Sequence, residues 1–141
     1  MVNGNAQLFT ISLHKASQNK LINEIEIIDD FQKFLRTIEI AYRKAPYFDV
    51  VYELLRRIVT YPEKQLARFI LNSLREISAY LQLETEFLMS SSIKKNNLNR
   101  GQVKIMEICQ LLGADAYINP KGGQELYDKS YFADHNVQLH F

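Results

Sequence analysis

A polar segment at residues 90–101 combines hydroxyl, amide and cationic side chains, as phosphate-binding loops do. It begins in the last two residues of the segment 85–91, which we predict to be a buried strand around Phe87, Leu88 and Met89. It leads into a helix predicted to begin at Gln102. Free backbone N–H groups and the positive end of the helix dipole favour an anion at such a helix start. The segment has no Walker pattern, so a solvated loop with Asn99 as the helix N-cap is the alternative. The candidate phosphate ligands are Ser91, Ser92, Lys94, Lys95, Asn97 and Arg100.

A second candidate site surrounds the glycine pair Gly122-Gly123. Glycine lets a ligand approach the backbone closely, and a helix predicted to begin at Gln124 could hold an anion at its start. Tyr117 and Tyr127 flank the pair and could stack on a sugar or a base. The alternatives are a plain turn whose glycines adopt positive φ, and tyrosines that pack in the core.

The residue types assign no catalytic acid, base or nucleophile. Of the three histidines, His14, at the end of a predicted strand, suits acid–base chemistry best, but a partly exposed histidine with no such role is the favoured interpretation. Cys109 has helical spacing from apolar neighbours and is interpreted as a small buried residue rather than a nucleophile. The three histidines are far apart and the chain has one cysteine, so we predict no metal site and no cofactor.

The composition favours one domain over residues 1–141. The chain is 47% hydrophobic and has a formal net charge of +1, which provides for a core and argues against a dedicated nucleic-acid binder. One cysteine excludes an internal disulfide. No apolar run approaches the roughly 20 residues that span a bilayer. Because Met1–Thr10 also lacks the cationic flank and apolar stretch of a secretory signal, we expect a cytoplasmic protein with no transmembrane segment.

The hydropathy pattern predicts an α/β fold in three parts. An N-terminal β segment has strands at 8–13 and 23–28. Asn3-Gly4 indicates a hairpin turn before them, but only two residues precede it, so either this turn is wrongly assigned or the chain begins partway through a larger fold. Carboxylates of Asp29 and Asp30 start the first of three helices. The last third alternates strands and helices, which favours a mainly parallel sheet with ligands at its strand-to-helix loops. The helices are expected at 31–44, 48–59, 62–83, 102–112 and 124–133, and the later strands at 85–91, 116–118 and 137–141.

Three stretches of the chain resemble the WbqC-like family, in order and with matched spacing. They are 15–25, 42–48 with its Lys-Ala-Pro-Tyr-Phe run, and 117–127 with its Gly-Gly and Leu-Tyr pairs. Genes of this family tend to lie among those for O-antigen and other surface polysaccharides. The resemblance therefore implies a role in making or modifying an activated sugar, and it makes Lys44 a candidate substrate contact.

Members of this family look longer than this chain. They open with a Gln-Pro-Tyr-rich segment and a Trp/Asn/Arg-rich segment, so the resemblance implies the C-terminal part of a longer WbqC-like fold. Whether the chain is an enzyme stays open. It is either a transferase acting on an activated sugar, or inactive without groups that the longer proteins carry.

Two functions are compatible with these observations. In the first, the protein binds or modifies a nucleotide-activated or phosphate-bearing sugar, with Lys94, Lys95 and Arg100 on the phosphate. The Gly122-Gly123 loop and the tyrosines then hold the remainder of the ligand. In the second, the protein is a non-enzymatic assembly module of a sugar-pathway complex, associating as a homo-oligomer or with other proteins through an open sheet edge. Saturable binding of a nucleotide sugar distinguishes the two.

Overall fold

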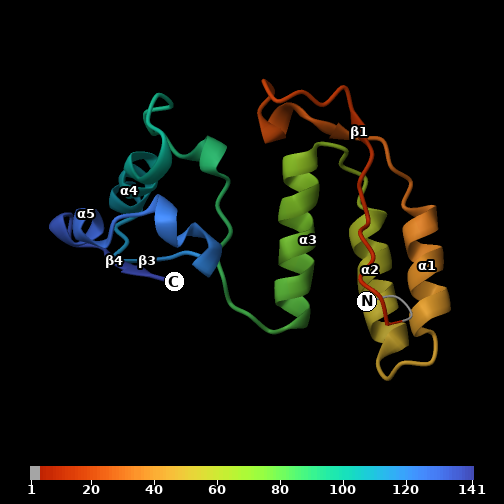
Figure 1. Ribbon diagram of the computed structural model, residues 1–141. Coiled ribbons are helices and arrows are strands. Elements are labelled where there is room, and N and C mark those ends of the chain that lie inside the picture. Colours follow the sequence, from red (N-terminus) through yellow and green to blue (C-terminus); the bar gives the residue numbers. More distant parts are fainter. Residues whose placement is uncertain (1–3) are drawn as a thin grey trace. The chain divides into compact units, whose positions relative to one another are not determined.

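Two compact units make up the chain in the computed structural model, which describes residues 4–141 (Figure 1). One unit extends to Phe87 and the other comprises Leu88–Phe141. Each has its own cluster of buried hydrophobic side chains. The single domain expected from the sequence stays a prediction, because a division into compact units does not establish whether they unfold separately. The expected turn at Asn3-Gly4 falls partly outside the described residues.

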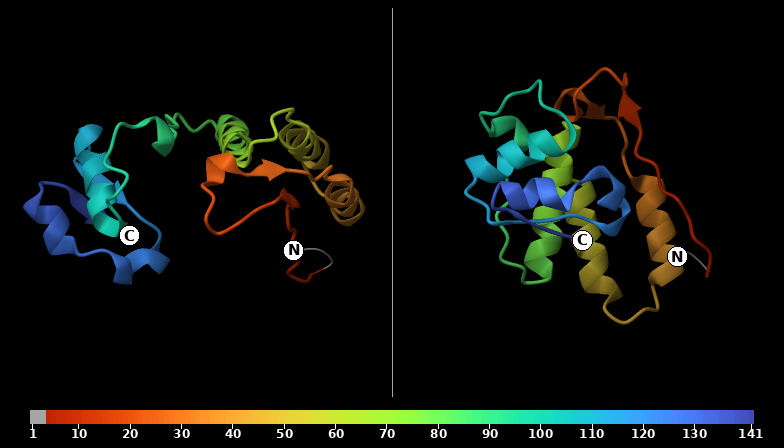
Figure 2. Two further views of the ribbon diagram at one scale, coloured as in Figure 1. Left: turned by 90° about the horizontal axis from the view of Figure 1, so that it is seen from above. Right: turned by 60° about the vertical axis from the view of Figure 1, so that its left-hand side comes forward.

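Three helices and a two-stranded antiparallel sheet form the first unit. The strands are β1 (Leu13–His14) and β2 (Glu26–Ile27), with a short 3-10 helix, η1 (Ile22–Glu24), before β2. The helices are α1 (Gln32–Tyr42), α2 (Phe48–Val59) and α3 (Leu66–Tyr80). Contacts join α2 to α1 and to α3, so the helices form one layer with α2 in the middle (Figure 2).

The core of the first unit lies where the apolar faces of these helices meet. The rings of Phe31 and Phe69 stack with centroids 5.3 Å apart and planes 7° apart. Leu54 and Ile58, four residues apart on α2, are buried in the same cluster, as expected for positions that share one helix face. The helices predicted at 31–44 and 48–59 are confirmed, the second at both ends.

The start of α1 is set by the two aspartates that precede it, as predicted. The backbone N–H of Phe31 donates to Asp29 Oδ1 at 2.8 Å, and that of Gln32 donates to Asp30 Oδ1 at 3.1 Å. The N–H groups of a first helical turn have no partner within the helix. The carboxylates therefore satisfy donors that would otherwise depend on water.

Two expectations for the first unit are wrong. The segment 8–12 is not a strand, because regular pairing begins only at Leu13, opposite Ile27. The third helix begins at Leu66 and not at Pro62. The reason is that Ile27 N donates to Lys64 O and Leu66 N donates to Ile25 O, both at 2.8 Å, which holds the chain before α3 in an extended bridge.

The second unit is built around one parallel strand pair. Its strands, β3 (Ala116–Ile118) and β4 (Gln138–His140), pair Tyr117 with Leu139. The helices are α4 (Gly101–Leu111) and α5 (Lys129–Asp134), with 3-10 helices η2 (Ser90–Ser92) and η3 (Lys121–Leu126). Phe132 is fully buried at the centre of the hydrophobic cluster. Its other buried members are Met106, Cys109, Val137 and Leu139.

The mixed α/β class is confirmed, but a mainly parallel sheet is not found in residues 4–141. The described residues form one parallel pair and one antiparallel pair of strands, in separate sheets. The run 85–91 is not a strand, because it lacks a partner strand and Leu88 is half exposed, and its last residues enter η2. The helix predicted at 124–133 is divided. Asp128 caps a new helix there by accepting from Ser130 N at 2.8 Å.

Candidate functional site

The cationic side chains of the 90–101 loop bond to the loop's own backbone. Lys95 Nζ donates to the carbonyl of Ser90, and Arg100 donates to the carbonyls of Asn97 and Asn99. The hydroxyl of Ser92 donates to Met89 O at 2.7 Å. These donors shape the loop and are only partly free for a ligand.

Glu107, on α4, anchors this loop and was not singled out in the sequence. Its carboxylate accepts from Asn96 N at 2.7 Å and from Asn99 Nδ2 at 2.9 Å. The carboxylate places a negative charge beside the amides that a phosphate would use, which disfavours a phosphate at that end of the loop. The side chains of Ser91 and Lys94 are exposed, and Lys94 makes no ion pair with any described residue.

A cluster of polar and aromatic side chains lies at the end of β3. Tyr117 donates its hydroxyl to Asn119 Oδ1 at 3.3 Å, and its ring lies 5.7 Å from that of Tyr127. The ring of Tyr117 also stacks on Phe132, with centroids 5.7 Å and planes 11° apart. Burial, followed by the hydroxyl of Tyr127, raises the pKa of Tyr117 to about 12. Tyr117 is therefore a neutral hydrogen-bond donor at physiological pH.

The two glycines of the second candidate loop differ in their surroundings. A Cβ built on Gly123 would collide with the Asn119 amide Nδ2 and lie 3.5 Å from Tyr127 Cε2, whereas one on Gly122 meets nothing within 4 Å. The interpretation that both glycines supply positive φ is wrong, because neither has it. The backbone of Gly123 is approached closely, but by Asn119 of this chain. Gly123 N donates to Pro120 O at 2.9 Å and closes the turn.

A hydrogen bond links the start of α4 to the start of α5. Asp128 N, just after Tyr127, donates to Gln102 Oε1 in the first turn of α4 at 2.9 Å. No side chain caps the start of α4, where Arg100 is the N-cap residue. The first turn of α4 therefore lies beside the backbone of Tyr127 and Asp128. Hydrogen bonds from the side chain and the backbone N–H of Ser130 lower the pKa of Asp128.

Lys44 is not grouped with the other candidates. It is exposed in the connection between α1 and α2, in the first unit, whereas the two loops belong to the second. There the backbone turns through a bond from Ala45 N to Tyr42 O at 2.8 Å. The role of Lys44 as a substrate contact stays a prediction from the family resemblance.

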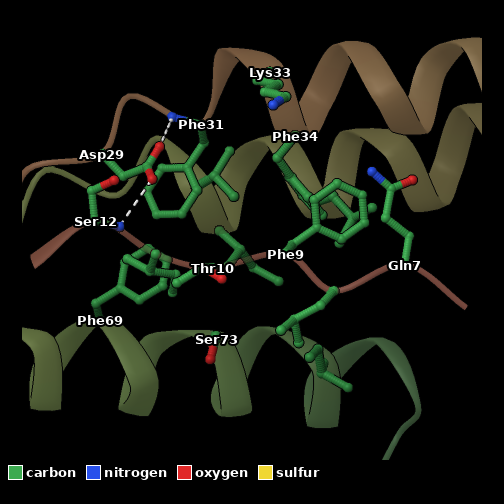
Figure 3. A pocket seen from close by; sticks show the side chains of 16 residues that line it. Gln7, Phe9, Thr10, Ser12, Asp29, Phe31, Lys33, Phe34, Phe69 and Ser73 are labelled. Carbon is green, nitrogen blue, oxygen red and sulfur yellow. Dashed lines mark hydrogen bonds between the residues drawn. The ribbon is translucent and has the colours of Figure 1, made fainter.

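A cavity of about 680 Å³ in the first unit was not predicted (Figure 3). The segment 7–12 crosses it between α3 on one side and α1 and α2 on the other. Apolar side chains of the three helices, and of Phe31 just before α1, line it. These residues are Phe31, Phe34, Leu55, Ile58, Val59, Phe69 and Ile77.

Asp29 closes one end of this cavity. Its Oδ1 accepts from Phe31 N at 2.8 Å, and its Oδ2 accepts from Ser12 N at 3.1 Å. These backbone hydrogen bonds, first from Phe31 and then from Ser12, lower the pKa of Asp29. Its carboxylate thus fastens the segment 7–12 to the start of α1.

Comparison with known proteins gives one match. The family model described as the WbqC-like protein family matches residues 1–141. No curated protein and no solved structure matches the chain. Within residues 4–141, no helix is both long and apolar enough to cross a membrane, and no three side chains of His, Cys, Asp or Glu gather as metal ligands would.

Proposed function

This chain belongs to the WbqC-like protein family, and from that premise we propose that it binds a nucleotide-activated or phosphate-bearing sugar in the biosynthesis of O-antigen or another surface polysaccharide. The proposal is one of binding. Group transfer, the cytoplasmic location and the longer parent fold stay predictions from the sequence.

The bond from Asp128 N to Gln102 Oε1 is the observation that carries the proposal. It joins the uncapped first turn of α4 to the backbone that follows Tyr127, so an anion-binding helix end and a residue with an aromatic ring are neighbours. The helix end favours a phosphate. The hydroxyl groups of a sugar could donate hydrogen bonds to the side-chain amide oxygen of Asn119 and to the carboxylate of Asp128.

The charges around the site limit where the phosphate would lie. Glu107 and Asp128 are carboxylates that would repel it, whereas Lys94 is exposed on the approach to α4. We therefore expect the phosphate between Lys94 and the first turn of α4, and the sugar toward Tyr127. Lys95 and Arg100 contribute through the shape of the loop as well as through charge.

The test is binding of defined ligands to the full chain. UDP-glucose, dTDP-glucose, UMP, glucose 1-phosphate and inorganic phosphate are titrated separately by calorimetry and by thermal shift, because a ligand of the native state raises the melting temperature. We expect saturable binding of at least one sugar phosphate or nucleotide sugar, and weakening of about tenfold in the double variant Lys94→Ala with Arg100→Ala, on the scale of one charge-assisted contact.

A matched double variant controls for the loss of charge. Lys20→Ala with Lys64→Ala removes two exposed lysines from the first unit and should leave binding unchanged. No binding of any of the five ligands to a cooperatively melting protein would overturn the proposal, as would equal weakening in both double variants.

The open edges of the β3–β4 sheet favour assembly as a second function. Each strand has one partner among the described residues, and Ile118 on β3 is 76% exposed. An exposed apolar edge strand is a template for pairing with another chain. Sedimentation equilibrium should then show a homo-oligomer that Ile118→Lys dissociates, whereas a monomer at all concentrations would argue against self-assembly.

A further inference from the structure

The cavity of the first unit has the features of a ligand site that lies apart from the candidate sugar site. Its volume of about 680 Å³ is within the range of small-molecule pockets, roughly 300–1,000 Å³. We propose that it binds a single-chain amphiphile with an anionic head group, of the chemical class of a fatty acid. The proposal goes beyond the sugar-binding function and does not depend on it.

The walls of the cavity suit a hydrocarbon chain. Phe34 of α1, Ile58 of α2 and Ile77 of α3 line it together with Leu8 and Phe9 of the crossing segment. Leu8 lines the cavity but is 88% exposed, and Phe9 is 37% exposed. An inserted acyl chain would remove this apolar surface from water, which contributes roughly 25 cal/mol per Å² buried.

The charges at the cavity select the sign of the head group. Asp29 and Lys33 are the two charged residues of the lining. Both oxygens of Asp29 already accept backbone hydrogen bonds, from Phe31 and Ser12. Lys33 is exposed on α1 above Phe34 (Figure 3), and its ammonium group has no hydrogen bond or ion pair within residues 4–141. A carboxylate head can pair with Lys33, whereas a cationic head would meet it with repulsion.

The segment 7–12 is attached to the helices at few points, which leaves room for an acyl chain to enter beneath it. Among the described residues, no hydrogen bond fixes the backbone of residues 7–11. The segment is attached by the Ser12–Asp29 bond at one end, and Phe9 packs edge-on against Phe34 with centroids 5.0 Å apart. The free backbone could also pair with an extended peptide, but the concave apolar lining, to which three helices contribute, suits a small ligand better.

A tryptophan placed on the segment reports binding directly. The chain has no Trp, so Phe9→Trp creates a single reporter. We expect dodecanoate to shift its emission to the blue saturably, and 12-bromododecanoate to quench it by contact. Dodecyltrimethylammonium, with the same chain and the opposite charge, should bind at least fivefold more weakly.

Variants without the Phe9→Trp substitution test the binding of the head group and the binding of the hydrocarbon tail separately. Lys33→Gln should weaken dodecanoate binding about two- to fivefold in a calorimetric titration, as for an exposed ion pair, while Lys20→Gln should not. Ser73 lines the cavity, so the larger side chain of Ser73→Leu should narrow it and weaken dodecanoate binding, whereas Ser73→Ala should leave binding unchanged. Circular dichroism establishes that each variant is folded.

Three results would overturn the proposal. The first is no saturable response to dodecanoate, either in Phe9→Trp or in the thermal shift of the unmodified chain. The second is equal affinity for the anionic and the cationic amphiphile. The third is tight binding of an extended peptide that dodecanoate does not displace, which would assign the segment to strand pairing.

Discussion

The side-chain amide of Asn119 lies against the bare Cα of Gly123, in the space that a Cβ at residue 123 would fill. This contact closes the turn between β3 and η3. It also holds Asn119 where its Oδ1 accepts from the Tyr117 hydroxyl at 3.3 Å. Glycine is therefore needed at position 123 to leave room for the Asn119 side chain, and not to allow a positive φ.

Substitution of Gly123 should separate packing from flexibility. Gly123→Ala forces Asn119 away and should lower the free energy of unfolding of the second unit by about 1–3 kcal/mol, as overpacking does. Gly122→Ala, with nothing within 4 Å of its new Cβ, is the matched control and should be close to neutral. Chemical denaturation measures both variants, and equal destabilisation would contradict this role of Asn119.

The attachment of the crossing segment to Asp29 should depend on pH. Asn at position 29 keeps an acceptor for Phe31 N but loses the second oxygen that Ser12 N uses, so Asp29→Asn should cost about 1 kcal/mol at pH 7, the net value of a hydrogen bond. Because the folded-state pKa lies below the ordinary 3.8, this stabilisation is present above pH 3.8 and is lost as the pH falls through the lower folded value.

Asp30→Asn is the control for the loss of the acceptor. Asp30 uses one oxygen, toward Gln32 N, and asparagine retains that acceptor. Thermal unfolding from pH 2.5 to 7 should therefore show a pH-dependent difference between Asp29→Asn and the native chain, and at pH 7 Asp30→Asn should lose less stability than Asp29→Asn. Identical profiles would argue that the bond to Ser12 contributes nothing.

Tyr117 should be the tyrosine that ionises last. Burial and the Tyr127 hydroxyl raise its pKa to about 12, so an ultraviolet titration of the eight tyrosines should contain a step near that pH which Tyr117→Phe removes. The folded state holds this proton more tightly than the unfolded state. Its contribution to stability is therefore complete below pH 10 and is lost as the pH rises from 10 to 12.

Two core substitutions should show whether the units unfold separately. Phe132→Ala in the second unit and Phe69→Ala in the first each remove a buried ring and should cost about 3–5 kcal/mol. If the units are independent, amide exchange should accelerate in Leu88–Phe141 for Phe132→Ala and up to Phe87 for Phe69→Ala. Acceleration throughout the chain in both variants would instead support the single domain expected from the sequence.

The helical part of the fold could be predicted from the sequence because its signals are local. Apolar residues three and four apart identify α1 and α2, and Asp29 and Asp30 mark where α1 begins. The strands β3 and β4 were also found within a residue or two. A strand was wrongly predicted at 85–91 because an apolar run forms a strand only when another strand lies beside it, and hydropathy does not report that neighbour.

The candidate site could be predicted only in part. Tyr117, Gly123 and Tyr127 do lie together, since they are close in sequence around one turn. The contacts that define their surroundings join residues far apart in the chain. Glu107 bonds to Asn96 across 11 positions, and Asp128 to Gln102 across 26. No local spacing rule connects such pairs.

The sequence by itself therefore determined the family, the helices α1 and α2 with the aspartates that start α1, and which residues offer charge or an aromatic ring. These depend on residue type and on neighbours within one or two helical turns. The tertiary structure decided that Lys95 and Arg100 donate to carbonyls of their own loop, and that a side chain at residue 123 would collide with Asn119. It also decided that residues of α1, α2, α3 and the segment 7–12 line a cavity. Each of these depends on distances between elements, which are fixed only when the apolar faces pack together.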